Sequence, residues 1–412
     1  MLVGGGGRDR LLGNAGRDTL LGGAGQDRLE GGAGQDVLTG GPGLDRLIGG
    51  KGRDRAPSPG RDALVGVGCA AEPGARTLHR VRTACAHNDL LLELVAFAHE
   101  EAPFARRWLP QLERGRVGLQ VCAVYVDAVD LPELALRRAL QQVNAFLRAV
   151  RETGDRVVHV RTRDDLEAVA RGERLGLVLA LEGAEPLGND PTMVDVFWEL
   201  GVRMLGLAWM RRNAYADGNL EAPEGGLSRI GCQLVDRLAA VGCPLDLAHA
   251  NDGTVRDVLA RLPDEAPVLV SHADCRALAP GQRNVTDDVL RALGARGGVL
   301  GVMCHPFSLG AGAGLDEVCR HVEHAGEVAG WHAVGLGGDF TRQLARSGAV
   351  AAPRDVVLPP GQGLDDAVEG LAGPEDYPAL AAALAARGHD RTRVEAVMGG
   401  NLLAFLRRAL PA

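Results

Sequence analysis

The feature that most restricts what this sequence can fold into is a nine-residue repeat in residues 4–54. Full units begin at Gly4, Gly13, Gly22, Gly31 and Gly40, and a partial unit begins at Gly49. Each full unit fits the pattern G-G-x-G-x-D-x-U-x, in which U is apolar, except that Asn14 replaces one second glycine. Glycine permits the tight turns with positive φ that so short a unit requires. The strict period predicts a regular stack of turns.

Each full unit carries one aspartate at a fixed position and one leucine two places later. Stacking would bring the carboxylates together, and a hard cation with oxygen ligands would relieve their repulsion. The array resembles the calcium-binding repeats of RTX proteins, which form a parallel β-roll. The resemblance implies Ca²⁺ at Asp9, Asp18, Asp27, Asp36 and Asp45, with Asp54 in the partial unit. Leu11, Leu20, Leu29, Leu38 and Leu47 would line a thin inner core. A flexible glycine-rich segment is the alternative.

The rest of the composition excludes several classes of protein. The formal net charge of −8 disfavours a nucleic-acid binder, which usually has a basic domain. No apolar run is long enough to span a membrane, and the N-terminus lacks the apolar segment of a secretory signal peptide. The eight cysteines are scattered without a CxxC pair, which indicates ordinary buried thiols. Proline, serine and glycine after the repeats predict a linker over residues 55–79.

Residues 80–412 alternate short apolar runs with longer amphipathic stretches, which is typical of βα units and a parallel sheet. Eight such runs predict an α/β fold, a (β/α)8 barrel. The runs end at AHND (86–89), VCAVYVD (121–127), LVLALEG (177–183), VRMLGLAW (202–209), PLDLAH (244–249), VLVSHA (268–273), VLGVMCH (299–305) and AVGLGGDF (333–340). The predicted helices include residues 131–150, 195–200, 230–241, 286–295 and 314–329.

The ionisable residues of these runs gather at their carboxyl ends, and in a barrel these ends form the face that carries the active site. Imidazole and carboxylate together suit zinc and similar divalent ions. His87 and Asp89 are two residues apart, so a strand would present both on one side, where they can chelate one ion. The residues are His87, Asp89, Glu182, His249, His272 and Asp339.

The main domain resembles the membrane dipeptidase (renal dipeptidase) family of metallopeptidases. The most specific matches are the EG pair at Glu182, the SH pair at His272 and RNVTDD at 283–288. They occur in family order with AHNDL (86–90), LALEGAEPLG (179–188), LGVRMLGLAWMRRN (200–213), GGLSRIGCQLVDRLAAVGCPLDLAH (225–249), VLVSHADCRALAPGQRNVTDD (268–288), RGGVLGVM (296–303), AVGLGGDF (333–340) and VMGGNLLAFL (397–406).

The resemblance implies a zinc dipeptidase with a binuclear site. Glu182 would bridge two Zn²⁺ ions, His87 and Asp89 would bind one ion, and His249 and His272 the other. Two such ions can share a hydroxide and polarise the scissile carbonyl.

Two further residues complete the predicted site. Asp339 matches the family's acid/base residue and would carry a proton from the water to the leaving amine. Arg283 would receive the C-terminal carboxylate of a dipeptide through two parallel hydrogen bonds. The resemblance also allows a homodimer.

The sequence departs from the family pattern at several positions. Trp209 stands where many members have a histidine; it offers one N–H donor and cannot accept a proton, which predicts altered substrate specificity. Ala86 replaces the usual glycine. Thr341 and Arg342 replace Asp-Gly after GGDF. His305 either takes the place of a tyrosine that contacts the substrate carboxylate or has a structural role.

Three residues are expected to have no ligand role. His321 and His324 are three apart on a predicted helix, which indicates a solvated face rather than a ligand pair. Asp246 in LDLAH is expected to support neighbouring groups, since carboxylates near a metal often orient its histidines.

Two other functions remain open. One is a related metal-dependent amidohydrolase for another small amide, such as a β-lactam, an N-acyl amino acid or a D-amino-acid dipeptide. The other is a non-catalytic, calcium-dependent extracellular module. RTX arrays usually belong to proteins exported without an N-terminal signal peptide, so secretion by that route is expected; a cytoplasmic dipeptidase is the alternative.

Overall fold

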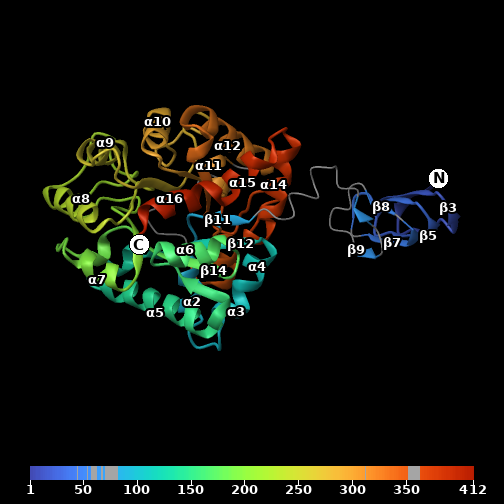
Figure 1. Cartoon of the computed structure of the whole chain (residues 1–412), viewed down its shortest axis with the longest axis horizontal. Coiled ribbons are helices and arrows are strands. Elements are labelled where there is room, and N and C mark those ends of the chain that lie inside the picture. The colour runs from blue at the N-terminus through green and yellow to red at the C-terminus, as the bar shows by residue number, and fades with distance from the viewer. Residues whose placement is uncertain are drawn as a thin grey trace. The chain divides into compact units, whose positions relative to one another are not determined.

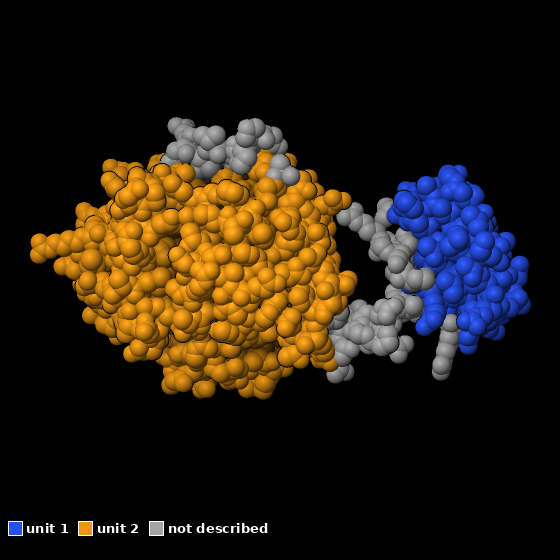
Figure 2. Space-filling view, turned by 90° about the horizontal axis from the view of Figure 1, so that it is seen from above, with its two compact units in different colours: residues 1–79 blue, residues 80–412 orange. Residues whose placement is uncertain are grey.

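The computed structural model describes residues 1–43, 45–52, 54–56, 63–65, 68–69, 82–310, 312–350 and 362–412. The chain divides into two compact units, Met1–His79 and Arg80–Ala412, which Figure 2 distinguishes by colour. Each unit has its own hydrophobic core and is described by itself.

The first unit is a parallel β-roll made of two sheets. Residues pair at a constant offset, for example Leu2 with Leu20 and Leu11 with Leu29, so two nonapeptides form one coil of the roll. One sheet contains β1 (Leu2–Gly7), β4 (Thr19–Gly25), β6 (Val37–Thr39), β8 (Arg55–Ala56) and β10 (Gly68–Cys69). The other contains β2 (Arg10–Leu12), β5 (Arg28–Gly34), β7 (Arg46–Gly52) and β9 (Ala63–Val65), and β3 (Ala15–Gly16) also pairs with β5. The predicted roll is confirmed.

The leucine of each repeat forms the core between the two sheets. Leu20, Leu29, Leu38 and Leu47 are fully buried together, and Leu11 at the first coil is partly buried against them. This confirms the inner core predicted from the repeat.

Glycine is required at the second position of the repeat because the backbone turns there with positive φ. Gly32 has a φ of 103°, and a Cβ at this position would lie 1.8 Å from the carbonyl oxygen of Asn14. Asn14 itself occupies the second position of its unit with a φ of 71°. Asparagine adopts this left-handed conformation more readily than most side chains, which explains the one exception in the repeat.

The roll continues beyond the boundary expected from the sequence. β8, β9 and β10 extend the two sheets, with Arg55 paired with Val37 and Leu64 paired with Leu47. The expectation of a linker over residues 55–79 is therefore wrong for these three strands, because backbone pairing continues after the repeat motif ends. The other residues of that linker lie outside the described part of the chain.

The second unit is a closed barrel of eight parallel strands surrounded by helices (Figure 1). Pairing of β12 with both β11 and β14, and of β11 with β19, closes the sheet. The strands are β11 (Thr83–Cys85), β12 (Val117–Tyr125), β14 (Leu175–Glu182), β15 (Val202–Gly206), β16 (Leu245–Asp246), β17 (Val268–Ala273), β18 (Leu300–Met303) and β19 (Val334–Gly338). Each predicted strand run contains one of them, so the (β/α)8 barrel is confirmed. β13 (Val157–His159), which the sequence analysis missed, pairs with β14 outside the barrel.

The five helices predicted from amphipathic stretches are present as α5 (Ala135–Thr153), α7 (Met193–Glu199), α8 (Arg229–Val241), α10 (Asp287–Arg296) and α12 (Leu315–Ala329). The further helices are α2 (Leu90–Ala96), α3 (Pro103–Arg107), α4 (Leu109–Arg114), α6 (Arg163–Ala170), α9 (Asp252–Arg261), α11 (Pro306–Leu309), α13 (Arg342–Ser347), α14 (Tyr377–Ala386), α15 (Arg391–Glu395) and α16 (Asn401–Ala409).

Apolar strand residues form the core of the barrel. β12 and β14 are buried along their whole length, as expected for strands of a parallel barrel. Leu402, Phe405 and Leu406 of α16 join the same hydrophobic cluster as Leu119 and Val178 of the strands.

No helix among the described residues combines the length and hydropathy of a membrane span. Every cysteine whose side chain is described is a free thiol, and all but Cys232 are buried.

Replacement of Gly32 by alanine is expected to destabilise the roll by about 1–3 kcal/mol, because its Cβ would collide with a neighbouring carbonyl oxygen. Hydrogen exchange of residues 1–56 in the full-length chain with calcium would measure this. Gly6→Ala is the matched control, since no atom lies within 4 Å of a Cβ at that position. Equal protection in the two variants would contradict this account of the repeat.

Candidate metal sites

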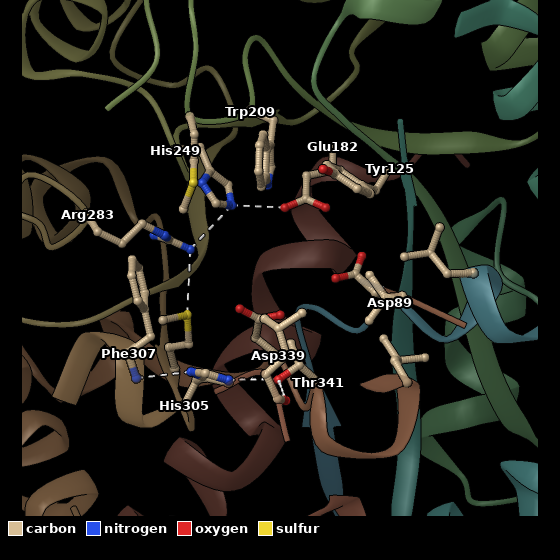
Figure 3. Close-up of a pocket in the computed structure, with 16 residues that line it drawn as sticks. Asp89, Tyr125, Glu182, Trp209, His249, Arg283, His305, Phe307, Asp339 and Thr341 are labelled. Carbon is tan, nitrogen blue, oxygen red and sulfur yellow. Dashed lines mark hydrogen bonds and ion pairs between the residues drawn. The ribbon is translucent and has the colours of Figure 1, made fainter. Parts of the chain in front are cut away.

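The carboxyl ends of the barrel strands bring the six predicted site residues together. Figure 3 shows Asp89, Glu182, His249 and Asp339 of this cluster. Glu182 is the last residue of β14, and His272 lies in β17. The other four stand in the first residues after their strands, where the chain turns over the end of the barrel. They are His87 and Asp89 after β11, His249 after β16, and Asp339 after β19.

Glu182 lies in the centre of the cluster, and its two carboxylate oxygens face different neighbours. Oε1 lies 2.9 Å from Nε2 of His249 and 3.4 Å from Nε2 of His272. Oε2 lies 3.8 Å from Nε2 of His87. One carboxylate with a separate set of partners on each oxygen has the arrangement of a bridging ligand.

His87 belongs to two groups that could hold a metal ion. One consists of His87, Glu182 and His272, and the other of His87, Asp89 and Asp339. Nε2 of His87 lies 3.7 Å from Oδ1 of Asp89 and 3.9 Å from Oδ1 of Asp339. The stacked rings of His87 and His272, with centroids 3.6 Å apart, hold the two groups side by side.

The electrostatics of the cluster favour a cation. Burial, followed by repulsion from Asp89, raises the pKa of Glu182 well above its usual value. Burial also raises the pKa of Asp339. Burial acts to lower the pKa of His87, but the surrounding carboxylates, Glu182 foremost, outweigh it and raise the pKa to about 10. These carboxylates therefore stabilise positive charge at the centre of the site.

The donor atoms fit a bound metal. Burial lowers the pKa of His249 and His272 well below the usual value, so both rings are neutral and have a lone pair to offer. Nε2 of His87, Oδ1 of Asp89 and Oε2 of Glu182 are buried without a hydrogen-bond partner. Buried polar atoms of this kind are costly unless something binds them, and a divalent ion would satisfy all three.

The backbone is strained at two of these site residues, and hydrogen bonds to a nearby aspartate hold two of the segments together. His249 has a φ of 64° and Asp339 a φ of 58°, conformations that side chains other than glycine rarely adopt and that concentrate at functional sites. Oδ1 of Asp246 accepts hydrogen bonds from the backbone N–H groups of Ala248 and Ser271. Asp246 thus links the segments that carry His249 and His272, which is the supporting role expected for it.

Arg283 is buried beside the cluster, and burial lowers its pKa. Its Nη2 lies 3.4 Å from Nε2 of His249 and 3.6 Å from Sδ of Met303, and its Nη1 has no hydrogen-bond partner. Among the described residues, no carboxylate forms an ion pair with this guanidinium. A buried cation without a carboxylate partner is costly, so the position is suited to an anionic group of a ligand.

A cavity of about 110 Å³ lies against the cluster and Arg283. Trp209 packs between two rings of its wall, with centroids 4.9 Å from Tyr125 and 5.8 Å from His249 (Figure 3). The sequence analysis missed Tyr125, whose hydroxyl is buried without a partner. Its position as the last residue of β12 was the signal that could have revealed it.

The prediction of a solvated histidine face on α12 is wrong. His321 is fully buried, and its Nδ1 accepts a hydrogen bond from the backbone N–H of Cys275. His324 is partly buried and lies 2.8 Å from Asp287 on α10. The packing of α12 against α10 covers this face, so neither histidine belongs to a ligand pair.

In the roll, the offset of two repeats arranges the aspartates in two columns. In one column the backbone N–H of Asp9 donates to Oδ1 of Asp27, at 2.8 Å, and in the other the N–H of Asp18 donates to Oδ1 of Asp36. In each of these side chains the second oxygen is buried without a hydrogen-bond partner, as it is in Asp54. A Cβ on Gly22 would lie 2.5 Å from the carbonyl oxygen of Gly40 and 2.7 Å from Oδ2 of Asp27. Oxygen atoms therefore converge along each column, as a calcium site requires.

Comparison with known proteins identifies both units. The family described as "Membrane dipeptidase (Peptidase family M19)" matches residues 75–349. The chain belongs to the membrane dipeptidase family. The family described as "RTX calcium-binding nonapeptide repeat (4 copies)" matches residues 3–38 and 21–56.

Curated relatives of this dipeptidase family member carry the same activity in their names. Dipeptidase verJ of Clonostachys rogersoniana is 31% identical over 72% of this chain and 74% of its own length. Dipeptidase aclJ of Aspergillus oryzae is 29% identical over 83% of this chain and 82% of its own length. The chain is therefore a metallopeptidase of the dipeptidase type rather than a non-catalytic module.

Solved structures agree on the fold. The dipeptidase AC, a metallopeptidase of the same family, has a TM-score of 0.70 and 25% identity, and the match covers 81% of this chain and 99% of that one. A metallopeptidase from Rhodobacter sphaeroides, liganded with a phosphinate mimic of the dipeptide L-Ala-D-Ala, has a TM-score of 0.70 and 23% identity. Its match covers 80% of this chain and 99% of that one.

Removal of the barrel's metal is expected to abolish peptide hydrolysis and to lower the unfolding midpoint of the barrel by about 5–15 °C, because Asp89, Glu182 and Asp339 would lose their counter-charge. Tryptophan fluorescence would report the barrel alone, since all four tryptophans lie in the second unit.

A chelator that prefers transition metals to calcium would serve for this experiment, with its non-chelating isomer as the control. Adding back a transition-metal ion should restore activity and stability, whereas calcium should not. Full activity in the chelated enzyme would contradict the assignment of the cluster as a metal site.

Proposed function

We propose that this chain hydrolyses the peptide bond of dipeptides at two Zn²⁺ ions bridged by Glu182. His87 and Asp89 would hold one ion, and His249 and His272 the other. The observation that carries the proposal is the divided environment of Glu182, whose two oxygens face separate ligand sets. Histidine nitrogen and carboxylate oxygen are ligands that suit zinc.

When bound, such a metal pair supplies a water of lowered pKa and polarises the scissile carbonyl. Asp339 would receive the proton of that water and pass it to the leaving amine. Burial raises the pKa of Asp339, which favours a carboxyl group that can both accept and return a proton.

Arg283 would hold the C-terminal carboxylate of the dipeptide. A guanidinium donates two parallel hydrogen bonds to a carboxylate, and Nη1 of Arg283 has no partner within the protein. Trp209, which stands close to His249, would contribute an N–H donor but no proton transfer. We infer that tryptophan in place of the family's usual histidine alters the range of substrates that the site accepts.

In the roll, we propose that Ca²⁺ binds the two aspartate columns and holds adjacent coils together. Relief of carboxylate repulsion by the ion would couple folding of the roll to calcium. Repeats of the RTX type usually belong to exported proteins, so we propose that the chain acts outside the cytoplasm.

Glu182→Gln is expected to lower the turnover of dipeptides by at least about 100-fold, a loss at the upper end of what residues supporting a metal ligand cause. The assay would use a panel of L,L- and L,D-dipeptides with the zinc-loaded enzyme, together with measurement of the metal content. The L,D members are included because one structural neighbour was solved with a mimic of L-Ala-D-Ala.

Glu199→Gln, at an exposed position on α7, is the matched control for that experiment. Turnover that survives in Glu182→Gln would overturn the bridging role. Two bound metals without turnover of any dipeptide would favour the alternative of an amidohydrolase for another small amide. The observation that favours this alternative is Trp209, which stands where many family members have a histidine.

Arg283→Lys is expected to raise KM for dipeptides about 10–100-fold with a smaller change in kcat, because a lysine keeps the charge but loses the paired hydrogen bonds. Dipeptide amides, which lack the carboxylate, provide the control: their hydrolysis should respond little to the substitution. An equal loss for acids and amides would argue against carboxylate binding by Arg283.

Asp27→Asn is expected to raise the calcium concentration needed to order the roll, because the substitution keeps the oxygen that accepts from Asp9 and replaces the unpartnered one. Calcium titration followed by hydrogen exchange of residues 1–56 would measure the midpoint. Glu30→Gln, an acidic residue of β5 outside the aspartate columns, is the control. Identical midpoints would contradict calcium binding at the columns.

A further inference from the structure

Three loop segments at the rim of the cavity are joined by a chain of hydrogen bonds through Thr341. The hydroxyl of Thr341 donates to the carbonyl oxygen of Leu364 at 2.7 Å. Nε2 of His305 lies 2.7 Å from the same hydroxyl oxygen (Figure 3). Because the single proton of Thr341 is directed to Leu364, Nε2 of His305 must be the donor in the second bond.

This assignment fixes the tautomer of His305, in which Nε2 carries the proton. Its Nδ1 accepts a hydrogen bond from the backbone N–H of Phe307 at 3.0 Å, so both ring nitrogens are occupied within the protein. Burial also lowers the pKa of His305, in keeping with a neutral ring. His305 therefore holds the rim together and has no nitrogen left for a substrate carboxylate, which decides between the two interpretations of this residue left open by the sequence.

A second hydrogen bond connects two of these segments. Nε2 of Gln362 donates to the carbonyl oxygen of Pro306 at 3.3 Å. The segment that carries Leu364 is thus attached to the loop after β19 through Thr341 and to α11 through Pro306.

These hydrogen bonds position an apolar wall of the cavity, which we define as Met303, Phe307, Leu344 and Leu364. The wall lines the cavity together with Arg283. The wall begins next to the guanidinium, since Sδ of Met303 lies 3.6 Å from Nη2 of Arg283. It comes from the end of β18, from α11, from α13 and from the loop that carries Leu364, so its shape depends on the bonds between these segments.

We propose that the hydrogen-bond chain of His305, Thr341 and Leu364 sets the position of this wall, and that the wall selects dipeptides whose C-terminal residue has a bulky apolar side chain. The inference rests on the proposed binding of the substrate carboxylate by Arg283. The carbon that bears this carboxylate also bears the side chain, which must therefore lie beside the same wall. Thr341 is a positioning residue in this scheme.

The expected size of the preference follows from the apolar contact. One methylene in a hydrophobic pocket changes kcat/KM by about 10-fold or more, so a C-terminal leucine should be favoured over glycine by at least about 10-fold. A C-terminal asparagine, close to leucine in size but polar, should be disfavoured because its amide would lie unpaired against the wall.

The test compares Ala-Leu, Ala-Asn and Ala-Gly as substrates of the full-length, metal-loaded enzyme and of two variants at one position. Thr341→Val removes the hydroxyl at nearly constant volume and is expected to lower the leucine-to-glycine ratio of kcat/KM about 10-fold. Thr341→Ser keeps the hydroxyl and should retain the ratio. Leu364→Ala, which shortens the wall but leaves the backbone acceptor, should also lower it and provides the test if Thr341→Val fails to fold.

A purely structural role for Thr341 would lower kcat/KM for all three substrates equally, and that result would overturn the proposal. So would a wild-type enzyme that cleaves all three with similar efficiency or prefers asparagine to leucine. Hydrolysis of no dipeptide at all would overturn the proposed function and this inference with it. Cleavage without preference would overturn this inference alone.

Discussion

Buried carboxylates that need a cation are the constraint on which both units of this protein depend. In the barrel, Glu182 lies at the centre of the cluster with Asp89 and Asp339 nearby, and burial raises the pKa of Glu182 and of Asp339. In the roll, stacking places one aspartate directly above another in each column. Burying unpaired charge is costly, so a bound cation would stabilise each arrangement. We therefore expect metal binding and folding to be coupled in both units.

The closed parallel barrel is what makes the candidate metal cluster possible. Closure through the pairing of β12 with β14 and of β11 with β19 directs all strand ends to one face. Site residues separated by well over a hundred residues, such as His87 and Asp339, thereby come within 4 Å of each other. The left-handed backbone at His249 and at Asp339 shows that the strand ends must bend sharply to present these side chains. The hydrogen bonds of Asp246 hold one part of that geometry in place.

Much of this architecture could be predicted from local patterns. The repeat period determined the roll and its leucine core, and alternating apolar and amphipathic runs gave all eight barrel strands. The failures have physical reasons. β13 was missed because it is short and pairs outside the barrel, and β8 was assigned to a linker because backbone pairing does not require the repeat motif. His321 was expected in solvent because helix periodicity does not reveal that α10 packs over that face.

The sequence by itself determined the candidate groups for the chemistry: the aspartate of each repeat, the ionisable residues at the strand ends and the arginine of the RNVTDD motif. These depend on residue type and on short spacing, which local pattern records. Only the tertiary structure decided that Glu182 faces two separate ligand sets, that Trp209 packs between Tyr125 and His249, and that His305 bonds to Thr341. Those relations join segments far apart in the chain, and their distances follow from barrel closure and loop packing, which no local stretch of sequence encodes.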